Sequence, residues 1–213
     1  MSAPTIAYLF RHGEALNNVR INTINGRSGN DPLTEKGLCQ AALLGKILRE
    51  KNIIPDISFS SSAVRARQTG EITLRAMGLP TLLIEDDRLH EQETGDWTGK
   101  IATDIFSEEV VTTFEALGKE LRPPNGESMN DISHRVLEWL NESAAIETSD
   151  PKTLFAFTHG GPLRSLPSHI LDWSHAETYA VKPGNTTATV VIKDGDIWRV
   201  EAVGVNAAEL EAL

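Results

Sequence analysis

The sequence has little of what marks several large classes of protein. Its 213 residues include one cysteine, Cys39, so an internal disulfide is excluded and a reducing compartment such as the cytoplasm is expected. No apolar run approaches a length of about 18 residues, which a membrane-spanning helix needs. The short apolar run near the start is broken at Arg11 and His12, so we expect neither a signal peptide nor a membrane segment.

Positive charge is also scarce. The chain has 20 Lys and Arg residues against 30 Asp and Glu residues, a net charge of −10, and no run of basic residues. We therefore expect no nucleic acid and no membrane among its partners, but a small phosphorylated substrate bound by a monomer or homodimer. Because such a substrate would be repelled by the overall charge, its site would need a local cluster of Arg and His.

Metal and nucleotide motifs are missing as well. The chain contains no HExxH, no paired CxxC, no EF-hand loop and no P-loop, so we expect no metal ion and no cofactor. Cys39 is followed by no arginine-bearing phosphate loop, and its place on the apolar stripe of an expected helix indicates a core residue. We expect His134, His169 and His175 to be surface or structural residues.

The distribution of apolar residues predicts alternating strands and helices. With 40% hydrophobic residues, the chain suits one compact domain, residues 1–213. Short apolar runs predict strands at 6–10, 57–59, 81–84 and 153–157, and a closing hairpin at 187–192 and 197–203. Helical spacing and capping residues predict helices at about 34–51, 64–77, 106–117, 128–148 and 159–171.

This alternation predicts an α/β fold, a three-layer sandwich with a mostly parallel, doubly wound sheet. Residues 85–130 lack a regular pattern, and we expect them to form a small cap-like insertion over the active site. In such folds the ligand binds beyond the carboxyl ends of the strands. Residues that follow the strands directly are therefore the first candidates for a functional site.

Polar segments follow three of the predicted strands, at residues 11–14 (Arg-His-Gly-Glu), 60–65 and 158–161. Because the ends of parallel strands meet at one edge of the sheet, four residues should converge there: Arg11, His12, Arg65 and His159. A single histidine beside a strand end is usually an ordinary polar residue. Two histidines, each followed by glycine, favour a shared site in which the backbone can approach a ligand closely.

Two arginines and two histidines in one pocket suit phosphoryl transfer. Guanidinium groups make bidentate contacts with phosphate oxygens, and a positive cluster stabilises the transition-state charge without a metal ion. A neutral imidazole is a competent nucleophile toward phosphorus, and a phosphohistidine divides one displacement into two easier steps. These residues therefore predict a metal-independent phosphoryl-transfer enzyme in which one of the two histidines, His12 or His159, attacks phosphorus while the other donates hydrogen bonds.

The chain also resembles a known family, the histidine phosphatase superfamily, which includes cofactor-dependent phosphoglycerate mutases, fructose-2,6-bisphosphatase and many broad phosphatases. The resemblance covers nearly the whole chain. The segments that match family motifs, in the order of the family, are Arg11-His12-Gly13-Glu14 with Asn18 and Pro32-Leu33-Thr34, SSSAVRARQT at 60–69, Leu89-His90-Glu91 with Gly95, Trp97 and Gly99, the segment from Pro123 to Ser128, and Thr158-His159-Gly160-Gly161. Ser62, Ala63 and His90 depart from the usual Pro, Leu and Arg.

The resemblance implies a role for each candidate: His12 as nucleophile, Arg11, Arg65 and His159 as ligands of the phosphoryl oxygens, Asn18 and Gly160 as further substrate contacts, and Glu91 as the acid that protonates the leaving alkoxide. An acid is needed because an alkoxide leaves poorly from a phosphate ester. Three other carboxylates are rivals for this role: Glu14, Glu93 and Glu127. Gly160 stands where the phytase branch of the family has Asp, which indicates the phosphoglycerate mutase-like branch.

The resemblance leaves three functions open. The first is a phosphomonoester hydrolase for a small phosphorylated metabolite, in which water attacks the phosphohistidine and Glu91 becomes the general base. The second is a cofactor-dependent phosphoglycerate mutase, but residues 92–95, Gln-Glu-Thr-Gly, lack the Arg-Tyr pair typical of mutases. The third is a non-catalytic phospholigand-binding protein, which the retained His12 and His159 disfavour. We therefore expect a hydrolase.

The identity of the substrate depends on how residues 21–31 and 97–121 close over the pocket. Trp97, Lys100 and Arg122 are candidates to line it. A lone Lys or Arg on an insertion is, however, usually solvated.

Overall fold

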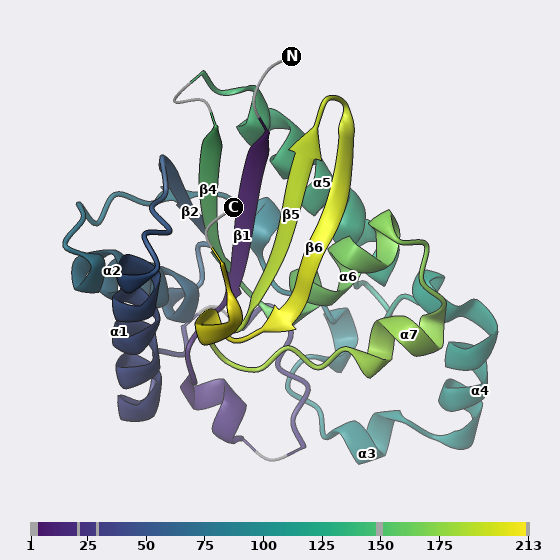
Figure 1. The fold of residues 1–213 in the computed structure, drawn as a ribbon. Helices are drawn as coiled ribbons and strands as arrows, with labels where there is room; N and C mark the ends of the chain where they lie inside the picture. The colour runs from purple at the N-terminus through teal and green to yellow at the C-terminus, as the bar shows by residue number, and fades with distance from the viewer. Residues whose placement is uncertain (1–3, 21, 29, 148–150, 212–213) are drawn as a thin grey trace.

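The structure is a computed structural model that describes residues 4–20, 22–28, 30–147 and 151–211. Its centre is one six-stranded sheet in the order β3-β2-β4-β1-β5-β6 (Figure 1). The strands are β1 (Thr5–Arg11), β2 (Ile57–Ser60), β3 (Ile84–Glu85), β4 (Lys152–Thr158), β5 (Ala188–Asp194) and β6 (Ile197–Val205). β3, β2, β4 and β1 are parallel, and β5 and β6 form an antiparallel hairpin at the other edge.

Helices cover both faces of this sheet. One layer holds α1 (Glu35–Glu50) and α2 (Val64–Met77), and the other holds α5 (Met129–Ala145) and α6 (Gly160–Ile170) (Figure 1). The shorter helices are α3 (Ala102–Ile105), α4 (Glu108–Leu117) and α7 (His175–Ala180), with the 3₁₀ helices η1 (Leu16–Val19), η2 (Asp87–Leu89), η3 (Gly95–Trp97), η4 (Gly118–Glu120) and η5 (Ala207–Glu209). The predicted three-layer α/β sandwich with a mostly parallel sheet is confirmed.

The alternation of side chains along β1 divides the core in two. Tyr8 and Phe10 belong to a buried cluster with residues of α1 and α2 such as Leu48. Leu9, on the opposite face of the strand, belongs to a second cluster with residues of α5 and α6 such as Trp139. Because each layer of helices is anchored to the sheet by its own cluster, the strand ends between the layers are held in place.

The connections open a crevice between β1 and β4. The chain leaves β1 toward α1 in one layer and leaves β4 toward α6 in the other. The two strands are neighbours, and their last residues, Arg11 and Thr158, stand opposite each other in the register. Where adjacent strands send their connections to opposite faces, a ligand can bind between the diverging loops. The next residues along the chain are His12 and His159.

Local signals fix the helix that begins beside this crevice. Thr34 caps α1, and its hydroxyl accepts a hydrogen bond from the Gly37 amide. A Cβ atom on Gly37 would lie 2.0 Å from the carbonyl oxygen of Glu14, so only glycine lets α1 pack directly on the loop after β1. On the other layer, Ser128 and Asp131 form the capping box of α5 that the sequence predicts.

Three sequence expectations differ from the structure. The strand predicted at 81–84 is wrong, since only Ile84 and Glu85 pair with β2, which itself ends at Ser60. Cys39 was expected in the core but is exposed, because Ala41, Leu44 and Leu48 with two glycines form the buried face of α1. α7 was not expected, since its six residues are too few for a helical pattern. The predicted last residue of α5, Thr148, lies outside the described residues.

The segment predicted as an insertion connects β3 to α5 and contains α3 and α4. These helices lie at the end of the molecule where the parallel strands finish (Figure 1). Aromatic rings join them to the rest of the fold: Trp97 to Phe106 at 5.7 Å between ring centroids, Phe106 to Phe114 at 6.1 Å, and Phe114 to Tyr179 of α7 at 5.2 Å. The insertion is thereby attached to the layer that contains α6.

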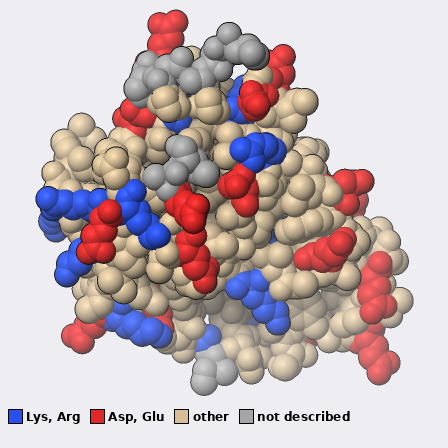
Figure 2. Space-filling view, in the orientation of Figure 1, with Lys and Arg blue, Asp and Glu red and all other residues tan. Residues whose placement is uncertain are grey.

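The surface carries charges of both signs. In the orientation of Figure 1, acidic side chains line the side where α4 lies, while basic and acidic side chains are interspersed around α1 and α2 (Figure 2). Within the described part of the chain, no helix has the length and apolar character needed to cross a bilayer.

The buried face of α5 yields a stability prediction. Leu140 is 0% exposed, so replacing it with Ala should lower the free energy of unfolding by about 2–5 kcal/mol through lost apolar burial and a residual cavity. Leu43, on α1, is 57% exposed, and the same substitution there should change stability by about 0.5 kcal/mol or less. Urea unfolding measures both variants. Equal losses would contradict the packing described for α5.

Candidate active site

The imidazole of His12 is the centre of the crevice. It follows β1 directly and is 2% exposed. Its Nδ1 lies 2.7 Å from the carbonyl oxygen of Gly13, and its Nε2 lies 3.2 Å from Nε of Arg65, which donates to it. A carbonyl oxygen can only accept, so Nδ1 carries the proton and Nε2 presents its lone pair. The backbone thereby selects the tautomer of this histidine.

Burial and neighbouring charge keep this ring neutral. The pKa of His12 is well below its usual value, chiefly because burial disfavours the imidazolium and then because Arg65 and Arg11 add positive charge nearby. A ring that stays unprotonated keeps the Nε2 lone pair available. The neutral Nε2 atom, which lies beside two cations, could therefore act as a nucleophile.

Two further buried histidine rings continue from His12, one packed against the next. The ring of His159 is 5.2 Å from that of His12, and the ring of His90 is stacked on His159 at 5.3 Å with an angle of 12° between the planes. Burial lowers the pKa of both rings, that of His90 to about 4. Nε2 of His159 is 2.9 Å from Oγ of Ser61, and its Nδ1 is buried without a hydrogen-bond partner among the described residues.

Two guanidinium groups border His12. Arg11 donates from Nη1 to the carbonyl oxygen of Pro183 at 2.7 Å, and Arg65 donates to the carbonyl oxygen of Ser28 as well as to His12. Burial lowers the pKa of both arginines, but a guanidinium remains charged at any physiological pH. Arg65 is 1% exposed, so its positive charge acts where water is largely excluded.

Glu91 is the carboxylate of the cavity. Its Oε1 accepts hydrogen bonds from the amides of Gln92 at 2.8 Å and Gly161 at 2.9 Å, whereas no described residue donates to Oε2. A Cβ atom on Gly161 would lie 2.2 Å from Oε1, so the carboxylate packs directly against the first turn of α6. One oxygen is held by the backbone, and the other is left for a ligand.

A network of charged groups holds the backbone of Glu91. Its carbonyl oxygen accepts from both Arg27 and Arg135, each at 3.1 Å. The carboxylate of Glu127 bridges the same two guanidinium groups. The position of Glu91 is therefore fixed from the loop after β1 and from α5 together. Its amide also donates to Nδ1 of His90 at 2.9 Å, which links it to the stacked rings.

The rival carboxylates are engaged elsewhere. Glu14 pairs with Lys36 at 2.7 Å, and Glu127 is held between Arg27 and Arg135. Glu93 accepts from the amide of Gly95. None of the three lines the cavity, so among these four described carboxylates Glu91 alone can reach a bound ligand.

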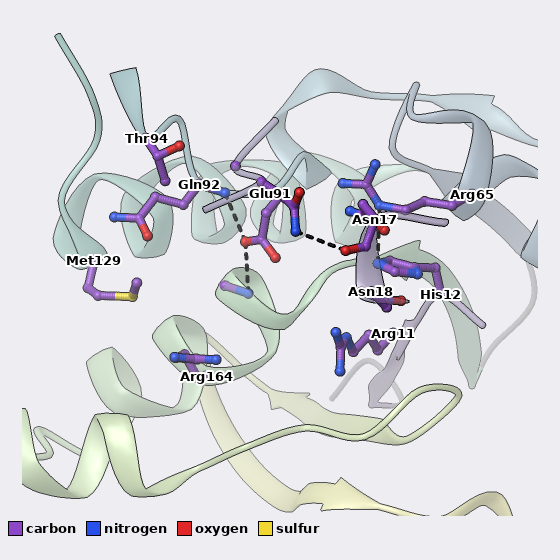
Figure 3. A pocket seen from close by; sticks show the side chains of 13 residues that line it. Arg11, His12, Asn17, Asn18, Arg65, Glu91, Gln92, Thr94, Met129 and Arg164 are labelled. Carbon is purple, nitrogen blue, oxygen red and sulfur yellow. Dashed lines mark hydrogen bonds between the residues drawn. The ribbon is translucent and has the colours of Figure 1, made fainter. Parts of the chain in front are cut away.

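The cavity itself has a volume of about 230 Å³ (Figure 3). Its walls are formed by Arg11, His12, Asn17, Asn18, Asn25, Gly26, Arg65, Glu91, Gln92, Thr94, Met129, Gly161 and Arg164. Five of the predicted site residues are among them: Arg11, His12, Asn18, Arg65 and Glu91. His159 is instead fully buried against His12, and the glycine that reaches the wall is Gly161, next to the predicted Gly160.

Three residues proposed to line the pocket lie outside it. Trp97 packs on Phe106, and Arg122 pairs with Asp131 at 2.6 Å. Lys100 is exposed, as a lone lysine on an insertion usually is.

Sequence reasoning missed Arg164 and the neutral wall formed by Gln92, Thr94 and Met129. A signal for Arg164 was present, because it lies four residues after Gly160 on the helix that His159 caps. Residues four apart share one face of a helix. The neutral wall had no comparable signal, since it depends on how the loop after η2 folds.

Within the described ranges, no three or more His, Cys, Asp or Glu residues are grouped so that they could hold a metal ion.

Comparison with known proteins relates the site to a family. Residues 7–206 match the family described as the histidine phosphatase superfamily (branch 1). A 2,3-bisphosphoglycerate-dependent phosphoglycerate mutase of Chelativorans sp. is 31% identical over 205 residues, which cover 88% of this chain and 97% of that protein.

Solved structures show the same fold. A mycobacterial glucosyl-3-phosphoglycerate phosphatase is similar with a TM-score of 0.80 at 23% identity, covering 95% of this chain and 100% of that one. A protein named mycobacterial hydrolase 1 is similar with a TM-score of 0.82 at 24% identity, covering 95% and 99%.

The buried histidines predict that stability falls in acid. Burial lowers the pKa of His12, His90 and His159 below the value of about 6.5 expected in an unfolded chain. Between the two values the unfolded chain binds more protons than the folded one. The free energy of unfolding should therefore fall as the pH drops below about 6.5, by up to about 1.4 kcal/mol per pH unit for each histidine.

Urea unfolding at a series of pH values measures this slope. The His90→Gln variant should show a shallower loss between about pH 6.5 and about pH 4, because one proton fewer is taken up on unfolding. Leu43→Gln, at an exposed position on α1, removes and adds no titratable group, so it is the control and should keep the original slope. An unchanged slope in the His90 variant would show that this ring is not held neutral by the fold.

Proposed function

Because the chain belongs to the histidine phosphatase superfamily, an enzyme family of phosphatases and mutases, we propose that it is a phosphomonoester hydrolase. Its substrate is a small phosphorylated metabolite, and its intermediate is a phosphohistidine on His12. The observation that carries the proposal is the state of His12: a buried, neutral ring whose Nδ1 is committed to Gly13 and whose Nε2 faces two guanidinium groups and a carboxylate across one cavity.

In the first step, Nε2 of His12 forms a bond to phosphorus while the bond from phosphorus to the ester oxygen breaks. The hydrogen bond from Arg65 to Nε2 passes to a phosphoryl oxygen, which frees the lone pair. The positive charge that develops on the ring is stabilised by the hydrogen bond from Nδ1 to Gly13. Glu91 gives a proton to the leaving oxygen through Oε2, so an alcohol departs.

In the second step, water replaces the alcohol. Its oxygen forms a bond to phosphorus, and Glu91, now a carboxylate, accepts the proton that the water loses. The bond from phosphorus to Nε2 breaks, and its electron pair returns to the ring. Inorganic phosphate leaves, and both His12 and Glu91 return to their starting states.

In both steps Arg11 and Arg65 stabilise the negative charge on the phosphoryl oxygens. His159 packs against the ring of His12. Two buried guanidinium groups beside one phosphoryl group can take the place that Mg²⁺ has in other phosphoryl-transfer enzymes. We therefore propose that turnover needs no added metal, and loss of activity with EDTA that a metal restores would overturn this. The unpaired Cys39 suits the cytoplasm, the compartment we propose.

Phosphoglycerate mutase is the second candidate, favoured by the 31% identity to a mutase that spans most of both chains. Against it, the residues after Glu91 give the cavity the amide of Gln92 and the hydroxyl of Thr94, and no Arg-Tyr pair. Measuring inorganic phosphate release beside isomerisation of 2- and 3-phosphoglycerate separates the two. We expect hydrolysis to exceed isomerisation, and the reverse result would establish the mutase.

The phosphohistidine can be trapped directly. We expect rapid mixing with a ³²P-labelled ester, followed by quenching in alkali, to leave label on the wild-type chain that acid removes. The His12→Ala variant should carry no label and lose turnover by at least about 10³-fold, because the nucleophile is gone. His134→Gln, an exposed histidine outside the cavity, is the matched control. Label that persists without His12 would overturn the proposal.

The contact between Gly161 and Glu91 gives a second test. In Gly161→Ala the new methyl group would lie 2.2 Å from Oε1, so the carboxylate must move. A displacement of about 1 Å can cost about 10²-fold in rate, and we expect kcat to fall by about 10- to 100-fold. The matched background is Glu91→Ala, in which the side chain that the methyl group would displace is gone, so adding Gly161→Ala there should cost much less. Equal losses would contradict the role of Glu91.

A further inference from the structure

Arg164 is the charged residue of the cavity wall that the proposed reaction leaves unused. It lines the cavity from α6, yet with the residues that the structure describes it makes no hydrogen bond or ion pair, and its Nε is buried without a partner. The other two guanidinium groups of the cavity, those of Arg11 and Arg65, both donate to backbone carbonyl oxygens. A buried donor without an acceptor costs free energy, so Arg164 needs an explanation.

The protein holds Arg164 in place without neutralising it. Its guanidinium lies over the ring of Tyr179, 5.7 Å from the ring centroid, which positions the group and leaves its N–H edge open. Its positive charge lowers the pKa of Arg11, so the two cations destabilise each other in the free protein. A bound anion would remove both penalties.

The position of Arg164 relative to Glu91 indicates which part of the substrate would carry this anion. A Cβ atom on Gly160 would lie 3.8 Å from Nη2 of Arg164, 3.8 Å from Nε of Arg11 and 3.8 Å from Oε2 of Glu91. Arg164 is therefore no farther than twice that distance from the oxygen that would protonate the leaving group. In Figure 3, Arg164 and Met129 lie on one side of Glu91, and His12 and Arg65 lie on the other. Arg164 thus faces the part of the substrate that departs.

We propose that Arg164 binds a second anionic group, a carboxylate or a second phosphate, on the alcohol portion of the substrate. This inference rests on the proposed function, because Glu91 marks the leaving oxygen. The anionic group lies a few bonds from the ester oxygen, given the closeness of Arg164 to Glu91. The rest of the wall on this side, Gln92, Thr94 and Met129, is uncharged and accepts a neutral, hydroxylated remainder.

Matched pairs of esters test the proposal on the intact protein. The carboxylate arm compares 3-phosphoglycerate with glycerol 3-phosphate, in which a hydroxymethyl group replaces the carboxylate. The second-phosphate arm compares glycerol 1,3-bisphosphate with glycerol 3-phosphate, which differ only in the second phosphate. We expect wild type to favour the charged member of at least one pair by about 10-fold or more in kcat/KM, and the arm that responds identifies the group.

Variants assign that preference to one residue. Arg164→Gln should reduce the ratio of kcat/KM between the charged and uncharged members by about 10- to 100-fold, mainly through KM, because a charge-assisted hydrogen bond is lost. Arg164→Lys should keep part of the ratio, since the charge remains without the fork. Arg67→Gln is the matched control: Arg67 is on α2, pairs with Glu85 at 3.2 Å and does not line the cavity, so the ratio should be unchanged.

Two results would overturn the proposal. One is a wild type that shows no preference in either pair. The other is an Arg164→Gln variant that loses equally on both members, which would make Arg164 a ligand of the transferred phosphoryl group.

Calorimetric binding of the same esters to His12→Ala separates this proposal from the proposed function. If His12→Ala binds the charged esters more tightly and this preference depends on Arg164, the role of Arg164 is supported even if no ester is hydrolysed. Hydrolysis without any such preference would leave the hydrolase intact and remove the role of Arg164.

Discussion

The site depends on keeping one imidazole neutral among positive charges. His12 lies between Arg11 and Arg65, where the imidazolium form is disfavoured both by burial and by repulsion. The hydrogen bond from Nδ1 to Gly13 then decides which nitrogen presents the lone pair. The same cations that disfavour protonation of the ring favour a phosphoryl group beside it. One arrangement would therefore serve the proposed reaction twice, by keeping the ring nitrogen unprotonated and by attracting the phosphoryl group.

The fold supplies this arrangement through backbone contacts more than through side chains. β1 and β4 end in register, and their connections diverge to opposite layers, which leaves room for a ligand between them. Glycine at 37 and at 161 allows the start of each following helix to approach the crevice closely. Glu91, from a loop far away in the sequence, is then held by the amide of Gly161 in α6 and by the two arginines that Glu127 joins.

The two ends of the cavity differ in how their positive charges are held, which a site for phosphate alone would not need. One end has buried guanidinium groups that already donate to the protein and suit a phosphoryl group. The other end has Arg164 over Tyr179, beside uncharged walls and with no ion-pair partner in the part of the chain that the structure describes. Because the overall charge of the chain is −10, such local positive charge is needed wherever an anion is to bind. Specificity would then be decided at the end of the cavity away from His12.

The sequence by itself determined the order of strands and helices, the caps at Thr34 and Ser128, and the candidates His12 and Glu91, because periodicity, capping and short motifs are local properties of the chain. It misplaced β3 and Cys39, since edge pairing and the exact buried face of a helix depend on neighbours. Only the tertiary structure decided that Arg164 enters the cavity and has no hydrogen-bond partner among the described residues, because this depends on the spatial arrangement of segments far apart in the sequence.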